Sequence, residues 1–133
     1  MAALLTLGRC LSAIGDTESS LRTFVVALAD ATGSGNPGGI ADAVDGLAEV
    51  SCDSGDIELA VELTALSDAL REQRHVAVPS VVTFVRRDLI DLFRAQLDPS
   101  GYAELRRAGA QRDVHWVVER VTAERPGTGL AGT

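Results

Sequence analysis

The sequence predicts an all-α fold built from helix–turn–helix units. Residues 3–16 form a segment with small and apolar residues at helical spacing, and residues 43–56 form a similar segment forty residues later. Each segment ends with Gly-Asp and is followed by a second helical stretch. Repeated helix pairs are typical of solenoid proteins, which usually bind other molecules rather than convert them. No segment alternates with period two over a useful length, and the β-branched run 76–82 contains a proline, which argues against an internal strand.

The first two helices are predicted from their ends as well as their spacing. A helix over about 2–14 stops at Gly15, because glycine tolerates the positive φ of a helix end. Either of the next two residues can cap a second helix, which runs over 17–32. That helix ends in the segment 33–39, GSGNPGG, which is the clearest break in the chain.

The second helix pair follows the same plan. A third helix is expected from about Gly39 to Asp53, and residues 54–56 repeat the first turn. The fourth helix runs over 57–74, with leucines at helical spacing along one face. Residues 75–79 are then a short connector that leads into the next helix.

Three further helices are expected after this connector. The fifth runs over 80–97, the sixth begins near residue 98 and is ended by Gly109, and the seventh spans about 113–124. On the fifth helix the solvent face is expected to carry Arg86, Arg87 and Asp88. Its inward face is expected to carry Val81, Phe84, Val85, Leu89, Leu92 and Phe93.

These elements form one domain. At 133 residues the chain is long enough for one domain with a real core, and that core must use alanine, leucine and valine because aromatics are only 4%. We expect a single helical domain over 1–125, with repeats at 2–32 and 40–74 and capping helices over 79–125. Residues 126–133 are expected to be a flexible tail or linker.

Charge and apolar runs narrow the function classes. The formal net charge is −7, and all twelve basic residues are arginine, a usage typical of a high-GC bacterium. An acidic domain without a basic stripe is a poor nucleic-acid binder. No apolar run reaches the roughly 18 residues that span a bilayer, and the N-terminal stretch has no basic leading segment, so we expect a cytoplasmic protein. Cys10 and Cys52 are expected to be buried free thiols, with a disulfide or a metal pair as the alternative.

The first unit resembles a tetratricopeptide repeat. That family has large apolar residues around an apolar-glycine pair in its first helix, and a small residue, an aromatic and an alanine in its second. The positions that carry this pattern are Leu4, Leu7, Gly8, Leu11, Ser20, Phe24 and Ala27. The second unit keeps only part of it and has polar residues at Ser51, Thr64 and Ser67. The forty-residue period also exceeds the usual 34.

The C-terminal part extends the resemblance. Residues 97–121, with Tyr102, Leu105 and Gly109 at matching places, are similar to the C-terminal helical region of large ATPase-containing signalling regulators of high-GC bacteria. Such regulators can also carry an adenylate-cyclase-like domain or a LuxR-type DNA-binding domain. The resemblance implies a regulatory protein–protein interaction module. ATP, cyclase or DNA-binding activity would belong to other parts, because this chain has no phosphate loop with lysine.

Four carboxylates at helical spacing are the main candidate for a binding site. In tetratricopeptide stacks the first helix of each repeat lines a concave groove, and the predicted lining is Arg9, Ser12, Asp42, Asp45, Glu49 and Asp53. The four acidic residues are separated by three, four and four positions, so their carboxylates lie on one face of the predicted helix. We expect this stripe to bind a basic segment or a free amino group of a partner. The alternative is a solvated acidic face.

Catalysis, metals and cofactors are not expected. The two histidines, His75 and His115, have no aspartate or cysteine at ligand spacing, and no nucleophile elbow is present. The rare aromatics Tyr102 and Trp116 are possible anchors, either in the core or at an interface.

Three functions compete on this sequence. The leading hypothesis is a module that binds another protein or another domain of its parent regulator. A small helical enzyme or ligand sensor would instead need an apolar pocket between the repeats and the C-terminal helices. Homodimerisation through the N-terminal repeat is the third hypothesis, because two repeats are fewer than usually make a stable stack.

Overall fold

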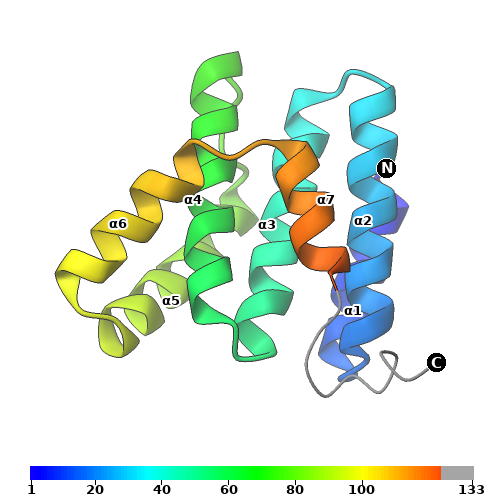
Figure 1. The fold of residues 1–133 in the computed structure, drawn as a ribbon. Coiled ribbons are helices and arrows are strands. Elements are labelled where there is room, and N and C mark those ends of the chain that lie inside the picture. Colours follow the sequence, from blue (N-terminus) through cyan, green and yellow to red (C-terminus); the bar gives the residue numbers. More distant parts are fainter. Residues whose placement is uncertain (124–133) are drawn as a thin grey trace.

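The computed structural model describes residues 1–123, and within them it contains seven helices and no strand, which confirms the all-α class (Figure 1). The expected tail at 126–133 lies outside the described residues. The helices are α1 (Ala2–Ala13), α2 (Thr17–Gly33), α3 (Pro37–Asp53), α4 (Ile57–Arg74), α5 (Ser80–Gln96), α6 (Pro99–Ala110) and α7 (Val114–Thr122).

One turn structure joins the first four helices, and it recurs every twenty residues. A residue with positive φ stands at Gly15, Gly35 and Gly55, with φ values of 86°, 63° and 90°. The following residue donates its N–H to the carbonyl five positions earlier, at 2.9 Å in all three turns, which is the pattern of a Schellman helix end. The side chain of that following residue then caps the next helix by accepting an N–H three residues on; these caps are Asp16, Asn36 and Asp56.

The fourth turn of this series is altered. His75 has φ 54°, and Val76 donates to the carbonyl of Arg71 at 2.9 Å, so the same helix end forms without glycine. Val76 has no side-chain oxygen to cap a helix, and α5 begins only at Ser80 with no side-chain cap. The twenty-residue series therefore ends after α4.

The structure refines one glycine assignment from the sequence and corrects another. The break expected in segment 33–39 is present but shorter, because α2 ends at Gly33 and α3 begins at Pro37, where Asn36 caps it by accepting the Gly39 N–H at 3.0 Å. Gly109 does not end the sixth helix but lies inside α6. A Cβ at this position would overlap the backbone of Glu62, so the glycine serves the close approach of α6 to α4.

The core is centred on Phe24 of α2, which is 1% exposed. Its ring lies between α1 and α3, and a Cβ at Gly8 would stand only 2.7 Å from it. Gly46 of α3 flanks the ring from the other side in the same way. α7 closes this core by adding Val117 and Val121. A second, smaller cluster forms where α5 and α6 meet α4.

The predicted inward face of α5 is partly wrong. Val81 and Phe84 are 57% and 71% exposed, whereas Val82 and Phe93 are buried. Arg86, predicted to face solvent, points inward and has a side chain only 15% exposed. With Arg86 inward, its guanidinium pairs with the buried Asp45 of α3 and the partly exposed Asp68 of α4.

The two cysteines lie in different surroundings. Cys52 is buried as expected, but Cys10 is exposed, and both are free thiols. Burial, and after it the nearby charge of Asp53, raises the pKa of the Cys52 thiol.

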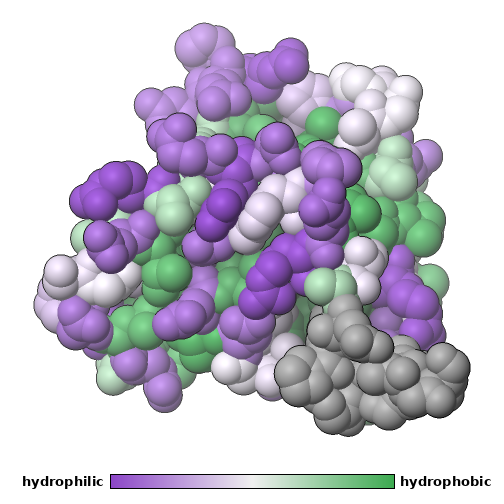
Figure 2. All heavy atoms as spheres, viewed as in Figure 1, coloured by the Kyte–Doolittle hydropathy of each residue, from purple (hydrophilic) through white to green (hydrophobic). Residues whose placement is uncertain are grey.

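Hydrophobic side chains also remain on the surface. Figure 2 shows hydrophobic atoms along the edge where Figure 1 places α1 and α2. Exposed apolar residues on these two helices are Leu7, Ile14 and Val26. No helix among residues 1–123 is both long and apolar enough to cross a membrane.

Candidate functional site

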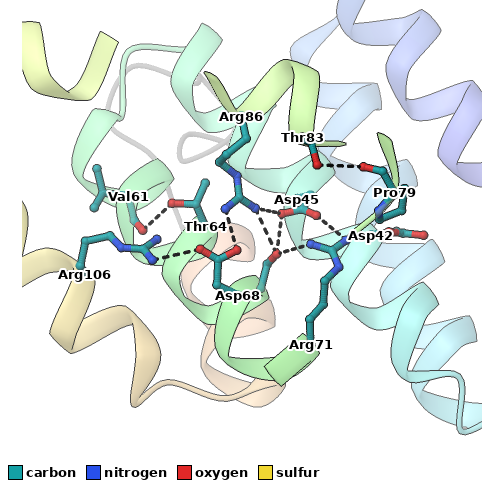
Figure 3. Close-up of polar contacts among 11 residues, drawn as sticks. Asp42, Asp45, Val61, Thr64, Asp68, Arg71, Pro79, Thr83, Arg86 and Arg106 are labelled. Atoms are coloured by element: carbon teal, nitrogen blue, oxygen red, sulfur yellow. Dashed lines mark hydrogen bonds and ion pairs between the residues drawn. The ribbon is translucent and has the colours of Figure 1, made fainter. Parts of the chain in front are cut away.

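A network of ion pairs joins helices α3 to α6 (Figure 3). Arg86 of α5 places Nη2 2.7 Å from Asp45 Oδ1 and Nη1 2.7 Å from Asp68 Oδ1. Asp68 of α4 also accepts a hydrogen bond from Arg106 of α6 at 2.9 Å. Because Arg86 bridges carboxylates of two helices, it holds α5 against the α3–α4 hairpin. Burial alone would lower the pKa of Arg86, but the charges of Asp45 and Asp68 hold it above its ordinary value.

Arg71 of α4 forms the other end of the network. This side chain is 3% exposed, and its Nη2 donates to Asp42 Oδ1 at 2.8 Å. The Ser67 hydroxyl donates to Asp45 Oδ1 at 2.6 Å and accepts from Arg71 Nη1 at 2.9 Å. The network thus contains three aspartates and three arginines, so its formal charges cancel.

Two buried atoms of the network lack a hydrogen-bond partner within residues 1–123, although its formal charges cancel. Asp45 Oδ2 lies 2.7 Å from Arg71 Nη2 as an ion pair, yet it has no hydrogen-bond partner among the described residues, and neither has Arg71 Nε. Burying charges costs free energy that a well-formed pair only roughly offsets, whereas removing one partner leaves an uncompensated charge. We infer that the network mainly selects the arrangement of α3, α4 and α5 and adds little net stability.

Next to this network an open hollow of about 220 Å³ lies between α1 and α3. Arg9 and Ser12 reach it from α1, and Glu49 and Asp53 reach it from α3. Ser12 Oγ donates to Asp53 Oδ2 at 3.2 Å. The same Phe24 ring that fills the core forms part of the lining. The hollow therefore combines two carboxylates, one guanidinium and one hydroxyl, above a Phe24 ring that is almost fully buried.

Glu49 lies where this hollow meets the network. It also lines a space of about 10 Å³ between α3 and α5, together with Thr64, Val82 and Arg86. No group among residues 1–123 donates a hydrogen bond to the Glu49 carboxylate or lies within ion-pair distance of it. This carboxylate is therefore half-buried without a direct partner.

Burial is the main reason that the pKa of Glu49 rises from 4.5 to about 7. Arg9 opposes the rise, the negative charges of Asp45 and Asp53 add to it, and Arg86 opposes it more weakly. Arg86 has little effect because two aspartates already neutralise it. Glu49 therefore changes its charge near neutral pH.

The structure separates the six residues predicted for the groove into two groups. Arg9, Ser12, Glu49 and Asp53 line one hollow, whereas Asp42 and Asp45 pair internally with Arg71. The acidic stripe is therefore not a uniform face, because its first half is neutralised and its second half is open.

The remaining candidates lie elsewhere. Tyr102 packs in the second core cluster, with its ring centroid 6.2 Å from that of Phe93. Trp116 is half-buried against the main core, and the guanidinium of Arg112 lies 4.6 Å from the centroid of the indole ring. Among the described residues, no group of three or more His, Cys, Asp or Glu side chains could hold a metal ion.

A larger hollow of about 650 Å³ lies along α6. It is open to solvent, and its charged lining residues, Glu58, Asp98, Glu104 and Arg107, are all exposed. Because exposed charges contribute little individually, this hollow has weaker means of selecting a ligand than the α1–α3 hollow.

Sequence reasoning missed the basic half of the network. A signal existed on the fourth helix, where Ala60, Thr64, Ser67 and Arg71 follow one another at helical spacing and are all buried. Small residues mark the buried face of a helix, so an arginine on the same face is expected to be buried and to pair with a carboxylate. The aspartates of the preceding helix are the available carboxylates.

Comparisons of this chain with protein-family models, curated proteins and solved structures find no match.

Proposed function

We propose that this chain is a protein-interaction module that binds a segment of a partner protein across the hollow between α1 and α3. The observation that supports this most is the meeting of polar side chains from two repeats, Arg9 and Ser12 with Glu49 and Asp53, around an open hollow. An open hollow suits a side chain presented by a larger partner. A sensor for a free small molecule would be expected to enclose its ligand, and both larger hollows are open.

A tetratricopeptide-like repeat is also part of this proposal. What supports it is the packing of Phe24 between Gly8 and Gly46, which places the aromatic and the glycine of the repeat pattern in contact. The forty-residue period departs from that family. The further suggestion, that the module belongs to a bacterial signalling regulator, rests on the resemblance of residues 97–121 alone.

The test is a search for peptide ligands with a matched blocking variant. Random dodecapeptides displayed on phage are selected on the full chain, and amide shifts map where the selected peptides bind. We expect shifts to concentrate on α1 and α3. Ala13→Trp, at an exposed position that lines the hollow, should abolish binding, whereas Ala103→Trp, at an exposed position on α6, should not. Shifts confined to other helices, or equal binding by both variants, would refute this assignment.

A further inference from the structure

We propose that the α1–α3 hollow is a cation site, which takes the ammonium or guanidinium group of a lysine or arginine in the bound segment, with Glu49 as its counter-ion. This inference rests on the proposed function and adds the chemistry that the hollow selects. It concerns Glu49 and Asp53, not Asp42 and Asp45, because only the first two carboxylates line the hollow.

The charges around Glu49 favour such a ligand. From α1 it faces Arg9, from its own helix Asp45 and Asp53, and from α5 Arg86, while α4 contributes only the uncharged Thr64 to the shared space. Asp45 and Arg86 belong to the neutral network, so they cancel as neighbours. The hollow itself holds two carboxylates and one guanidinium, and an ionised Glu49 leaves it with one negative charge in excess.

The unpartnered state of Glu49 gives the site its driving force. The Glu49 oxygens are not among the fully buried atoms that lack a partner, so water reaches them, and partial burial weakens the solvation of the charged form. A ligand cation supplies the missing partner, and it is held by a charge-assisted hydrogen bond. The methylene chain of lysine or arginine can lie against Ala13, an exposed apolar residue that lines the same hollow.

Arg9 is the internal competitor for this role. It lines the hollow with Glu49, yet no carboxylate among residues 1–123 lies within ion-pair distance of it. If a ligand cation takes the place that Arg9 could occupy, then removing the Arg9 charge should strengthen ligand binding. If the ligand cation binds away from Glu49, the same change should leave binding unaltered.

The binding should depend on pH. The ligand binds the ionised form of Glu49, and a group whose pKa is about 7 is about one-tenth ionised at pH 6 and nine-tenths ionised at pH 8. The apparent affinity for a cation should therefore rise about tenfold between these two pH values. A ligand that ignores Glu49 would show no such rise.

The experiment uses the full chain and acetylated, amidated octapeptides that differ at one central position: lysine, arginine, norleucine or glutamate. Dissociation constants come from amide shifts at pH 6 and pH 8. We expect the lysine and arginine peptides to bind about tenfold more tightly than the norleucine peptide at pH 8. Glu49→Gln should remove that preference and its pH dependence, Arg9→Gln should strengthen binding several-fold, and Glu72→Gln, at an exposed position on α4, should change neither.

The outcomes separate this inference from the proposed function. Equal binding of all four peptides at the hollow would keep the interaction module and overturn the cation site. No binding of any peptide there, while selected dodecapeptides bind elsewhere, would overturn both. The same experiment also measures the binding of putrescine, a free diamine. If putrescine binds as tightly as the lysine peptide, the ligand is a small cation, and the proposal of a protein segment is wrong.

Discussion

Replacing Glu49 by glutamine should stabilise the protein, and more so as the pH rises. The folded state raises the pKa of this carboxyl from 4.5 to about 7, mainly through burial, so the folded state holds the proton more tightly than the unfolded chain does. Between these two values the unfolded state binds fewer protons, and stability falls as the pH increases. At about 1.4 kcal/mol per pKa unit, the full cost of ionising Glu49 in the folded protein is on the order of 3 kcal/mol above pH 7.

Glutamine has a similar shape and no charge, so Glu49→Gln should gain about 3 kcal/mol at pH 8 and less than about 1 kcal/mol at pH 5. Urea unfolding of both chains at the two pH values measures this. With an m value of about 2 kcal/mol per molar urea, the midpoint should rise by roughly 1.5 M at pH 8. Glu72→Gln, at an exposed position, should shift the free energy of unfolding by less than about 0.5 kcal/mol at either pH. A Glu49→Gln gain that is the same at pH 5 and pH 8, or a loss at pH 8, would refute this account of Glu49.

Four further outcomes follow from the fold, and each is checked by urea unfolding or by sizing. Arg71→Met should cost about 1–3 kcal/mol because the buried Asp45 loses one of its two arginine partners and the partly exposed Asp42 loses its only one. His75→Gly should stabilise by about 0.5–1 kcal/mol at the left-handed turn, and Gly55→Ala should destabilise by at least as much. Gly109→Ala should cost about 1–3 kcal/mol by forcing α6 from α4. Light scattering at micromolar concentration should show a dimer that Leu7→Asp dissociates; a monomer for the unchanged chain would exclude self-association through α1.

The helices could be predicted closely because their ends are encoded locally. A glycine followed by aspartate or asparagine fixes a helix end and the next cap within two residues, and this pair stands at 15–16, 35–36 and 55–56. The internal repeat of residues 3–16 at residues 43–56 includes only the first and third of these turns, because the second lies inside a longer run of Gly and Pro. The forty-residue repeat of helix pairs thus consists of two twenty-residue steps, each one helix and one turn.

Packing between distant helices could not be predicted in the same way. Periodicity on α5 placed Phe84 inside because phenylalanine is apolar, yet Arg86 occupies the inward position. The reason lies more than forty positions earlier in the chain, at Asp45, and no local pattern on α5 contains it. Likewise, Gly109 has the sequence signature of a helix end, and only the course of α4 shows why a side chain is excluded there.

The carboxylates of α3 show how the fold divides a uniform pattern into two uses. Asp45 and Glu49 are one helical turn apart and look equivalent in the sequence, but Asp45 faces the arginines of α4 and α5 whereas Glu49 faces the gap between α1 and α3. The first carboxylate is neutralised when the chain folds, so its charge contributes to the choice of fold. The second has no partner within the described residues, and its partial burial makes the charged form less stable, a cost that a proton or a cation from outside would offset. The cation site proposed above would give this carboxylate the partner that the fold does not supply, and the pH dependence of peptide binding tests that role.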